Sequence, residues 1–164
     1  MRALEEAMPL EGRRVALLGA GGAARAIAWG VQRAGARITV FNRTASRGQA
    51  LAQDFGLAFG GDPGDFDPHG FDIVVNATAA GFRAPEVKPL RAGQLAPHLV
   101  VMDEAFIPVR KKLIRDAAEL GCRVIDGTRM LLHQFCGQVE LYTGKPAPLE
   151  AMSAALLDEI ARVG

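Results

Sequence analysis

The chain has 164 residues, a formal net charge of +1 at pH 7, and 49% hydrophobic residues. This length corresponds to one ordinary domain with a sizeable core, and the near-neutral charge gives no electrostatic reason to expect a nucleic acid or an anionic membrane as a partner. No apolar run approaches the roughly 18 residues of a membrane span, the N-terminal residues contain no secretory signal, and the three histidines lack the spacing of a metal site.

Taken in chain order, short apolar runs alternate with longer segments of helical pattern. Residues 1–12 come first and are typical of the end of a linking helix, which suggests a chain trimmed from a longer one. The predicted strands cover residues 13–19, 36–42, 57–60, 71–78, 98–104 and 122–127. The predicted helices cover residues 23–35, 44–56, 108–121, 128–144 and 148–164. Residues 61–70 are too rich in Gly and Pro to predict a regular element.

Most of the predicted strands are apolar along their whole length, which is typical of strands that are buried on both faces of a sheet. Because helices separate them, the sheet is expected to be parallel, with right-handed crossovers. The sequence therefore predicts a single-domain α/β fold, a doubly wound sheet of the Rossmann type. Its six parallel strands are expected in the order 3-2-1-4-5-6.

A glycine-rich turn directly follows the first predicted strand. Gly19, Gly21 and Ala24 match the pattern G-x-G-x-x-A between a strand and a helix. Gly19 would allow the tight turn, Gly21 would let the backbone approach a pyrophosphate, and Ala24 would let helix and strand pack closely. The free N–H groups and the dipole at the start of the helix would hold the anion, so this turn predicts a dinucleotide site.

The second predicted strand ends in Asn42-Arg43-Thr44, and Arg47 follows one helical turn later. An acidic residue at this point commonly accepts a hydrogen bond from the adenosine ribose 2′-hydroxyl. Guanidinium groups instead match phosphate oxygens, and Asn42 and Thr44 add neutral donors. The cluster therefore predicts a ligand with a 2′-phosphate, which means NADP rather than NAD.

Motifs along nearly the whole chain, taken in order, resemble the C-terminal, NADP-binding domain of shikimate dehydrogenases. The first is Gly-Ala-Gly-Gly-Ala followed by Asn-Arg-Thr-x-x-Arg. The later ones are "NATAAG" (76–81), "MDEAFIP" (102–108), "GTRMLLHQ" (127–134) and "YTGKPAPLEAM" (142–152). That family reduces 3-dehydroshikimate to shikimate with NADPH in aromatic amino acid biosynthesis. The resemblance implies that residues 13–147 are the NADP-binding domain of such an oxidoreductase. The helix at 148–164 would pack on this domain or on a missing substrate domain.

The resemblance also implies roles for individual residues. The residues expected to hold the diphosphate are Gly19, Ala20, Gly21, Gly22 and Ala23. Those expected to hold the adenosine 2′-phosphate are Asn42, Arg43, Thr44 and Arg47. Those expected to line the remainder of the cofactor are Asn76, Ala77 and Thr78 after the fourth strand, and Gly127 and Met130 near the nicotinamide. Gln134 is expected to project toward the hydroxyl groups of the substrate.

The chain departs from the family pattern at several positions. The catalytic Lys and Asp of the family, and its hydroxyl residues for the substrate carboxylate, belong to an N-terminal substrate domain that is absent here. Phe106 replaces a Tyr, Ala79 and Ala80 replace hydroxyl residues, and Glu104 and Ala105 replace an apolar pair. These changes could mean a different substrate preference or could be neutral.

No residue of this chain is expected to be catalytic. Reduction of a ketone by hydride transfer needs a general acid, and three side chains were candidates. Tyr142 is expected on a packed helix face, and His133 lies about 100° around the helix from Gln134. Asp103 ends a strand in the right region, but a capping or loop role fits it equally well. The chain alone is therefore expected to be inactive.

Other functions remain open. The chain could be a stand-alone, non-catalytic NADP-binding module, or the NADP domain of a related enzyme such as quinate dehydrogenase or glutamyl-tRNA reductase. The expected partners are NADP(H) and, through the missing domain, a small polyhydroxy acid. An apolar stripe of Met152, Leu156 and Ile160 on the last helix could drive self-association. Cys122 and Cys136 are not in a C-x-x-C motif and predict reduced thiols in a cytoplasmic protein.

Overall fold

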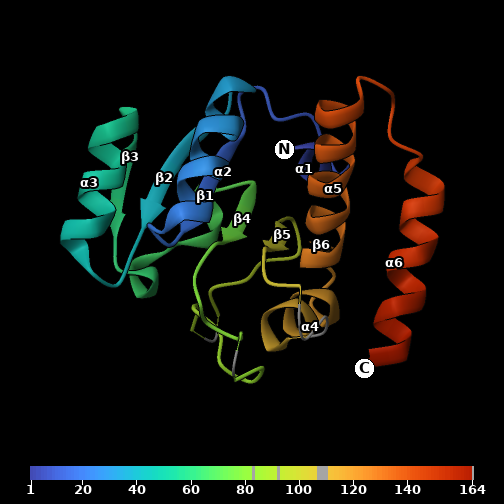
Figure 1. Cartoon of the computed structure of the whole chain (residues 1–164). Coiled ribbons are helices and arrows are strands. Elements are labelled where there is room, and N and C mark those ends of the chain that lie inside the picture. The colour runs from blue at the N-terminus through green and yellow to red at the C-terminus, as the bar shows by residue number, and fades with distance from the viewer. Residues whose placement is uncertain (83, 92, 107–110, 164) are drawn as a thin grey trace.

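Six short apolar segments form one parallel sheet at the centre of the computed structural model, which describes residues 1–82, 84–91, 93–106 and 111–163 (Figure 1). The strands are β1 (Arg14–Leu18), β2 (Arg37–Phe41), β3 (Ala58–Gly61), β4 (Ile73–Asn76), β5 (Val100–Asp103) and β6 (Arg123–Ile125). Their order is β3-β2-β1-β4-β5-β6, and each neighbouring pair runs parallel. The predicted strand number, order and direction are therefore confirmed.

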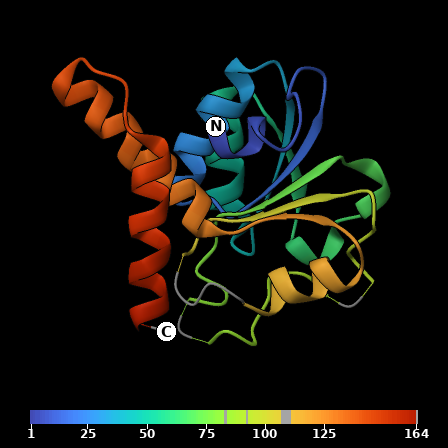
Figure 2. The same cartoon turned by 90° about the vertical axis from the view of Figure 1, so that its right-hand side faces the viewer.

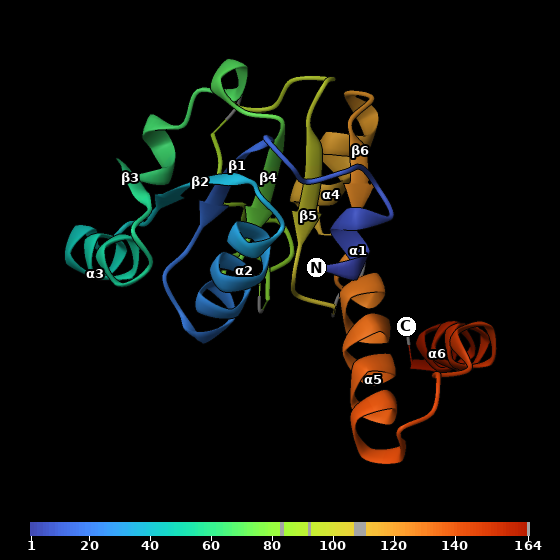
Figure 3. The same ribbon diagram turned by 90° about the horizontal axis from the view of Figure 1, so that it is seen from above.

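Helices cover both faces of the sheet, as seen from the side and from above (Figures 2 and 3). They are α1 (Arg2–Glu5), α2 (Gly22–Arg33), α3 (Ala45–Phe55), α4 (Lys112–Glu119), α5 (Gly127–Thr143) and α6 (Leu149–Val163). One hydrophobic core lies between the sheet and α1, α2 and α3. A second core lies on the other face, where α4 and the aromatic rings of Phe66 and Phe71 cover the strands. The doubly wound architecture follows from these two cores.

Two segments differ from the expectations. Residues 61–70 contain two short 3₁₀ helices, η1 (Pro63–Asp65) and η2 (Pro68–Gly70). Each begins after an aspartate, Asp62 or Asp67, whose side chain accepts a backbone N–H, so an Asp-Pro pair starts a helical turn even in a Gly-rich stretch. The helix expected at 108–121 is described from Lys112 to Glu119, and the expected first turn at Pro108 lies outside the described residues.

The N-terminal segment forms only one helical turn, and this turn is docked on the domain. Leu4 of α1 is buried in the first core. The carboxylate of Glu6 accepts hydrogen bonds from Arg129 and contacts His133, both on α5. Arg2 pairs with Glu140, further along the same helix. Polar contacts at both ends thus fix α1 against α5.

The last two helices lie side by side, with α5 between the sheet and α6 (Figures 1 and 3). Met152, Leu156 and Ile160 of α6 are half-buried, and the Sδ of Met152 lies 3.8 Å from the Sγ of Cys136 on α5. The expectation for Tyr142 was wrong, because this side chain is 79% exposed near the end of α5.

Among the described helices, none is long and apolar enough to cross a membrane.

Candidate functional site

The turn between β1 and α2 passes very close to the loop that follows β4. Gly19 has a φ of +112°, and a Cβ atom there would lie 2.6 Å from the backbone oxygen of Ala77. Only glycine fits this conformation and this approach. The contact joins the carboxyl ends of β1 and β4, which is the point where the strand order reverses. In doubly wound sheets, ligands bind in the crevice at such a point.

The amino end of α2 faces this crevice without a side-chain cap. Gly21 is the N-cap residue and makes no side-chain hydrogen bond, and Gly22 begins a helix that is 12 residues long. A Cβ atom on Gly21 or Gly22 would meet nothing within 4 Å, so the backbone here is open to a ligand. Exposed first-turn N–H groups and the helix dipole together make a site for an anion such as a diphosphate.

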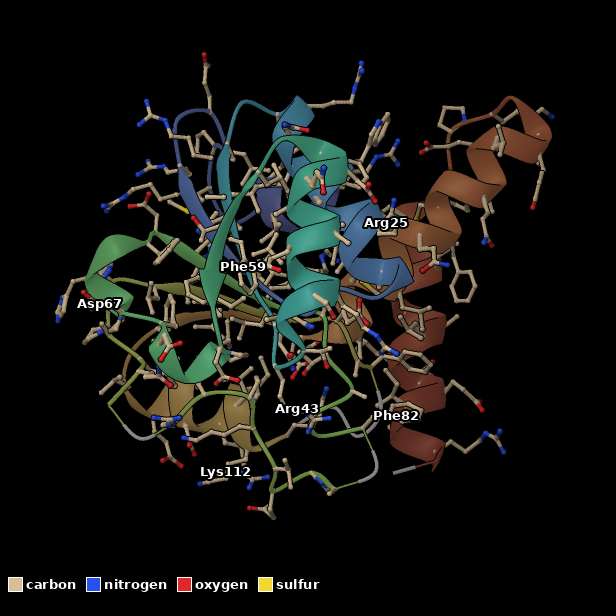
Figure 4. All side chains as sticks on the ribbon, turned by 90° about the vertical axis from the view of Figure 1, so that its left-hand side faces the viewer. Arg25, Arg43, Phe59, Asp67, Phe82 and Lys112 are labelled. Atoms are coloured by element: carbon tan, nitrogen blue, oxygen red, sulfur yellow. The ribbon has the colours of Figure 1, made fainter. Side chains whose placement is uncertain are left out.

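Basic side chains follow β2 on the adjoining side. Arg43 and Arg47 are exposed, and Thr44 is the N-cap residue of α3, although its hydroxyl makes no capping bond. Asn42 donates from Nδ2 to the backbone oxygen of Thr44 at 2.8 Å, which fixes the start of this turn. Figure 4 shows Arg43 below the first turn of α3, toward the loop that carries Phe82. The end of β2 thus offers two guanidinium groups and no carboxylate.

These segments enclose a cavity of about 730 Å³ at the carboxyl edge of the sheet. The predicted residues that line it are Gly19, Ala20, Gly21, Asn42, Arg43, Thr44, Arg47, Ala77 and Thr78. The lining residues that sequence reasoning did not assign to the site are Asp62, Pro63, Ala79, Ala80, Val87, Lys88 and Pro89. The volume lies in the range of small-molecule sites. Ala79 and Ala80 belong to the motif at 76–81 but were given no role there. No motif marked the other unassigned residues, because they belong to loops that only the tertiary fold brings to the cavity.

The remaining predicted residues lie outside this cavity. Gly22 and Ala23 are exposed in the first turn of α2, and Asn76 is buried beneath the loop after β4. Gly127 allows the start of α5 to touch the segment that follows β5, since a Cβ there would lie 2.5 Å from the backbone oxygen of Glu104. Met130 packs against the first core.

Gln134 and His133 point in different directions, as expected. Gln134 is exposed on α5, whereas the Nε2 of His133 lies 2.9 Å from a carboxylate oxygen of Glu6 on α1. His133 is therefore engaged in docking the N-terminal turn and not in the crevice.

A buried ion pair lies behind the cavity. Asp103 and Lys111 are each 1% exposed, and the Nζ of Lys111 donates to the Oδ1 of Asp103 at 2.6 Å. Asn76 donates to the other carboxylate oxygen at 3.1 Å. Asp103 thus has a structural partner, which agrees with the loop role that the sequence left open. Lys111 was missed, because lysines in an amphipathic helical pattern are normally exposed.

Glu104 presents an unusual carboxyl group at the carboxyl end of β5. Its Oε2 is buried and has no hydrogen-bond partner among the described residues. Burial raises the pKa of Glu104, and the neighbouring charge of Asp103 raises it further, while Lys111 acts in the opposite direction. A buried carboxyl without a partner favours its neutral form.

The donor set fits a phosphate-rich dinucleotide. It combines an uncapped helix start, a backbone approach that only glycine permits, and two arginines after β2. The described residues contain no group of three or more side chains that could hold a metal ion.

The chain matches two related family models. Residues 2–84 match the model described as shikimate / quinate 5-dehydrogenase, and residues 127–157 match the shikimate 5′-dehydrogenase C-terminal domain. A shikimate dehydrogenase (NADP(+)) from Halorubrum lacusprofundi is 43% identical over 153 residues. This match covers 92% of the chain but 56% of the relative, so the chain spans little more than half of that protein.

Solved structures show the same fold. Shikimate 5-dehydrogenase from Thermus thermophilus, in complex with NADP(H) and shikimate, has a TM-score of 0.86 and 33% identity, over 96% of the chain and 59% of that protein. A 5-ketofructose reductase from Gluconobacter has a TM-score of 0.87 and 35% identity, over 96% of the chain and 60% of that protein.

Proposed function

The chain belongs to the shikimate / quinate 5-dehydrogenase family, and from this premise we propose that it is the NADP-binding part of a shikimate dehydrogenase-like oxidoreductase. The reaction would be the reduction of 3-dehydroshikimate by NADPH to shikimate. The observation that carries the proposal is the crevice between Gly19 and the arginines after β2. Residues 13–147 would hold the cofactor, with residues 1–12 and 148–164 leading to the substrate-binding part of a longer protein.

Each part of the crevice would have one task. The first turn of α2 would receive the diphosphate, and Arg43 and Arg47 would pair with the 2′-phosphate. Ala77 and Thr78 would form the wall that continues toward the nicotinamide, with Gly127 and Met130 beyond it and Gln134 directed to the substrate. NADPH supplies the hydride when it is bound. The proton for the product alkoxide, and the groups that hold the substrate, would come from the part of the enzyme outside this chain.

A second candidate is the reduction of a different polyhydroxy ketone. Phe106, which is 37% exposed, replaces the family Tyr, and a protein named as a 5-ketofructose reductase has the same fold at 35% identity. A Phe side chain cannot donate a hydrogen bond to a substrate, so the pocket would be less suited to shikimate. Quinate is a further alternative within the family, and a non-catalytic NADP-binding module is the alternative outside it.

The proposal is tested by calorimetry of the chain with NADP and with NAD. We expect NADP to bind more tightly, because the end of β2 offers two guanidinium groups and no acidic side chain. Equal affinities for the two cofactors would contradict the assignment of the crevice.

We also propose a cytoplasmic location and a role for the last helix in assembly. Cys122 and Cys136 are free and buried, as expected of a reducing compartment. Leu157 on α6 is 59% exposed, and Leu141 near the end of α5 is 78% exposed. These two exposed side chains would be covered by the substrate-binding part or, in the chain alone, by self-association.

A further inference from the structure

The loop between β4 and β5 lines the cavity without a helix in its described residues to hold it in place. Thr78 and Ala80 of this loop contribute directly to the cavity wall. Loops of this kind are usually mobile unless their backbone groups are tied to a rigid element. In this loop, hydrogen bonds behind the cavity wall hold the backbone in place.

A continuous series of hydrogen bonds begins at the buried ion pair. The Oδ2 of Asp103 accepts a bond from Asn76, whose own Oδ1 accepts bonds from the backbone N–H of Thr78 at 3.1 Å and from its hydroxyl at 2.7 Å. The hydroxyl oxygen of Thr78 in turn accepts the N–H of Ala80 at 3.1 Å. The series therefore ends on Thr78 and Ala80, which line the cavity together with Ala77 and Ala79.

Lys111 anchors the other end of this series. It is the N-cap residue of α4, and its Nζ donates to the Oδ1 of Asp103 at 2.6 Å. Its alkyl stem packs against Gly81, where a Cβ would lie 2.8 Å from Cδ and where φ is +87°. Neither Lys111 nor Asp103 lines the cavity. The lysine thus contacts the loop once through its stem and once through the polar series.

We propose that Lys111 is a positioning residue for cofactor binding, which acts by fixing the Thr78–Ala80 wall through Asp103 and Asn76. The inference rests on the proposed function of the cavity. Charge-assisted bonds are shorter and more directional than neutral ones, so the ammonium group restricts the carboxylate to one orientation. That orientation determines which way the Asn76 amide points and hence where the Thr78 backbone lies.

The test compares Lys111→Met with Lys112→Met. Lys112 is the matched control, because it is the next residue on α4 and its side chain pairs with the Oδ1 of Asp116, so its replacement leaves the Oδ2 of Asp116 bound to Lys88. We expect Lys111→Met to weaken NADP binding by roughly three- to thirtyfold, which lies within the range of couplings in one hydrogen-bonded network. Lys112→Met should leave the affinity unchanged.

Amide hydrogen exchange separates positioning from general stabilisation. In Lys111→Met, exchange should accelerate at Thr78 and Ala80 while the β1 amides keep their protection. The effect on NADP affinity should also be non-additive with Thr78→Val, which removes the same series at its other end. Additive effects, or an acceleration spread evenly over the sheet, would overturn the proposal.

Lys111→Met alone would leave Asp103 buried without its partner, and this could prevent folding. The double variant Lys111→Met/Asp103→Asn avoids the problem, because it carries no charge at either position. It should fold and still show weakened NADP binding with faster exchange at Thr78; wild-type affinity and protection in this variant would overturn the inference. If the wild-type chain binds no NADP, the proposed function fails together with the cofactor role of Lys111. If the wild type binds and Lys111→Met behaves like Lys112→Met, only the inference on Lys111 fails.

Discussion

Arg43 carries the cofactor preference at the scale of single residues. Arg43→Ala should weaken NADP binding by about 1.5–3 kcal/mol, which is the usual size of a hydrogen bond to a charged group. NAD binding should barely change, because NAD has no phosphate at the ribose 2′ position. Calorimetry of the variant with both cofactors measures the difference.

Arg37 provides the matched control for this substitution. It is also an exposed arginine of the β2 region, but it begins the strand at the opposite edge of the sheet from the cavity. Arg37→Ala should leave both affinities unchanged. If Arg37→Ala and Arg43→Ala weakened NADP binding equally, the cause would be the change in net charge and not the loss of a phosphate contact.

Glu104 should lower the stability of the free protein at neutral pH. Burial raises the pKa of Glu104 above its ordinary value of 4.5, so the folded protein favours the protonated form. The stability that depends on this proton is present below the unfolded pKa and is lost as the pH rises through the folded pKa. Glu104→Gln mimics the protonated form and should raise the free energy of unfolding at pH 7 by roughly 1 kcal/mol.

Urea unfolding of this variant at pH 7 and pH 4 provides the measurement. The gain in the free energy of unfolding should be much smaller at pH 4, where the wild-type carboxyl is mostly protonated in both states. Glu119→Gln, which changes an exposed glutamate at the end of α4, should give no gain at either pH. A gain for Glu104→Gln that is the same at both pH values would contradict the role of the proton.

At the scale of elements, one carboxylate docks α1 on α5. Glu6 accepts two bonds of 2.6 Å from Arg129 and contacts His133, and the bond from Arg129 is the main reason why the pKa of Glu6 lies below its ordinary value. A carboxyl with a lowered folded pKa contributes stability above its unfolded pKa of about 4.5, and this contribution is lost as the pH falls through the folded value.

Glu6→Gln should therefore loosen α1 at neutral pH and have little effect in acid. Because Glu6 is partly exposed, the change in overall stability should stay below about 1 kcal/mol, and hydrogen exchange at Leu4 is the sensitive measurement. Glu159→Gln is the control, because it breaks an ion pair with Arg162 that lies entirely within α6. It should not change hydrogen exchange in α1. Equal protection of Leu4 in wild type and Glu6→Gln at pH 7 would refute the docking role.

The elements that could be predicted are those whose signals are local. Strands such as β1 and β4 are apolar runs between turn residues, and the glycine turn after β1 carries its own motif, so both were found. Tyr142 was placed wrongly because helical spacing shows which residues share a face but not whether a neighbour covers it. The end of α5 extends beyond the sheet, and nothing in the spacing records this.

The same limit applies to the candidate site. The arginines after β2 were identifiable because their position relative to the first strand is part of the motif. Lys88 and Asp62 reach the cavity from separate loops, and their place there depends on tertiary contacts. The loop of Lys88, for example, is tied to α4 by an ion pair with Asp116.

At the scale of the whole molecule, the chain alone should bind NADP but should not reduce 3-dehydroshikimate. General acid–base groups contribute about 10²–10⁴-fold to rates, and positioning of the substrate contributes up to about 7–11 kcal/mol of the barrier. No residue of this chain has been assigned the acid–base task, and Gln134 is the one residue assigned a part in positioning the substrate. Loss of NADPH absorbance with 3-dehydroshikimate measures the activity, and a substrate-binding domain of the family added in trans should restore it.

Turnover of the chain alone at roughly 1–10³ per second would show that the acid is within these 164 residues. Failure of the added domain to restore any activity would favour a non-catalytic NADP-binding module. A measurable rate with another polyhydroxy ketone but not with 3-dehydroshikimate would support the second candidate function.

The pairing of β1 with β4 also has a consequence for the order of folding. Val15 pairs with Ile73, and three crossovers lie between them in the chain, so this contact closes a long loop and should form late. The approach of Gly19 to Ala77 depends on the same pairing. The cofactor crevice is therefore expected to form late in folding, and NADP should not accelerate the first steps. Bound NADP should instead lower the rate of unfolding, because it must be released before the two halves of the sheet separate.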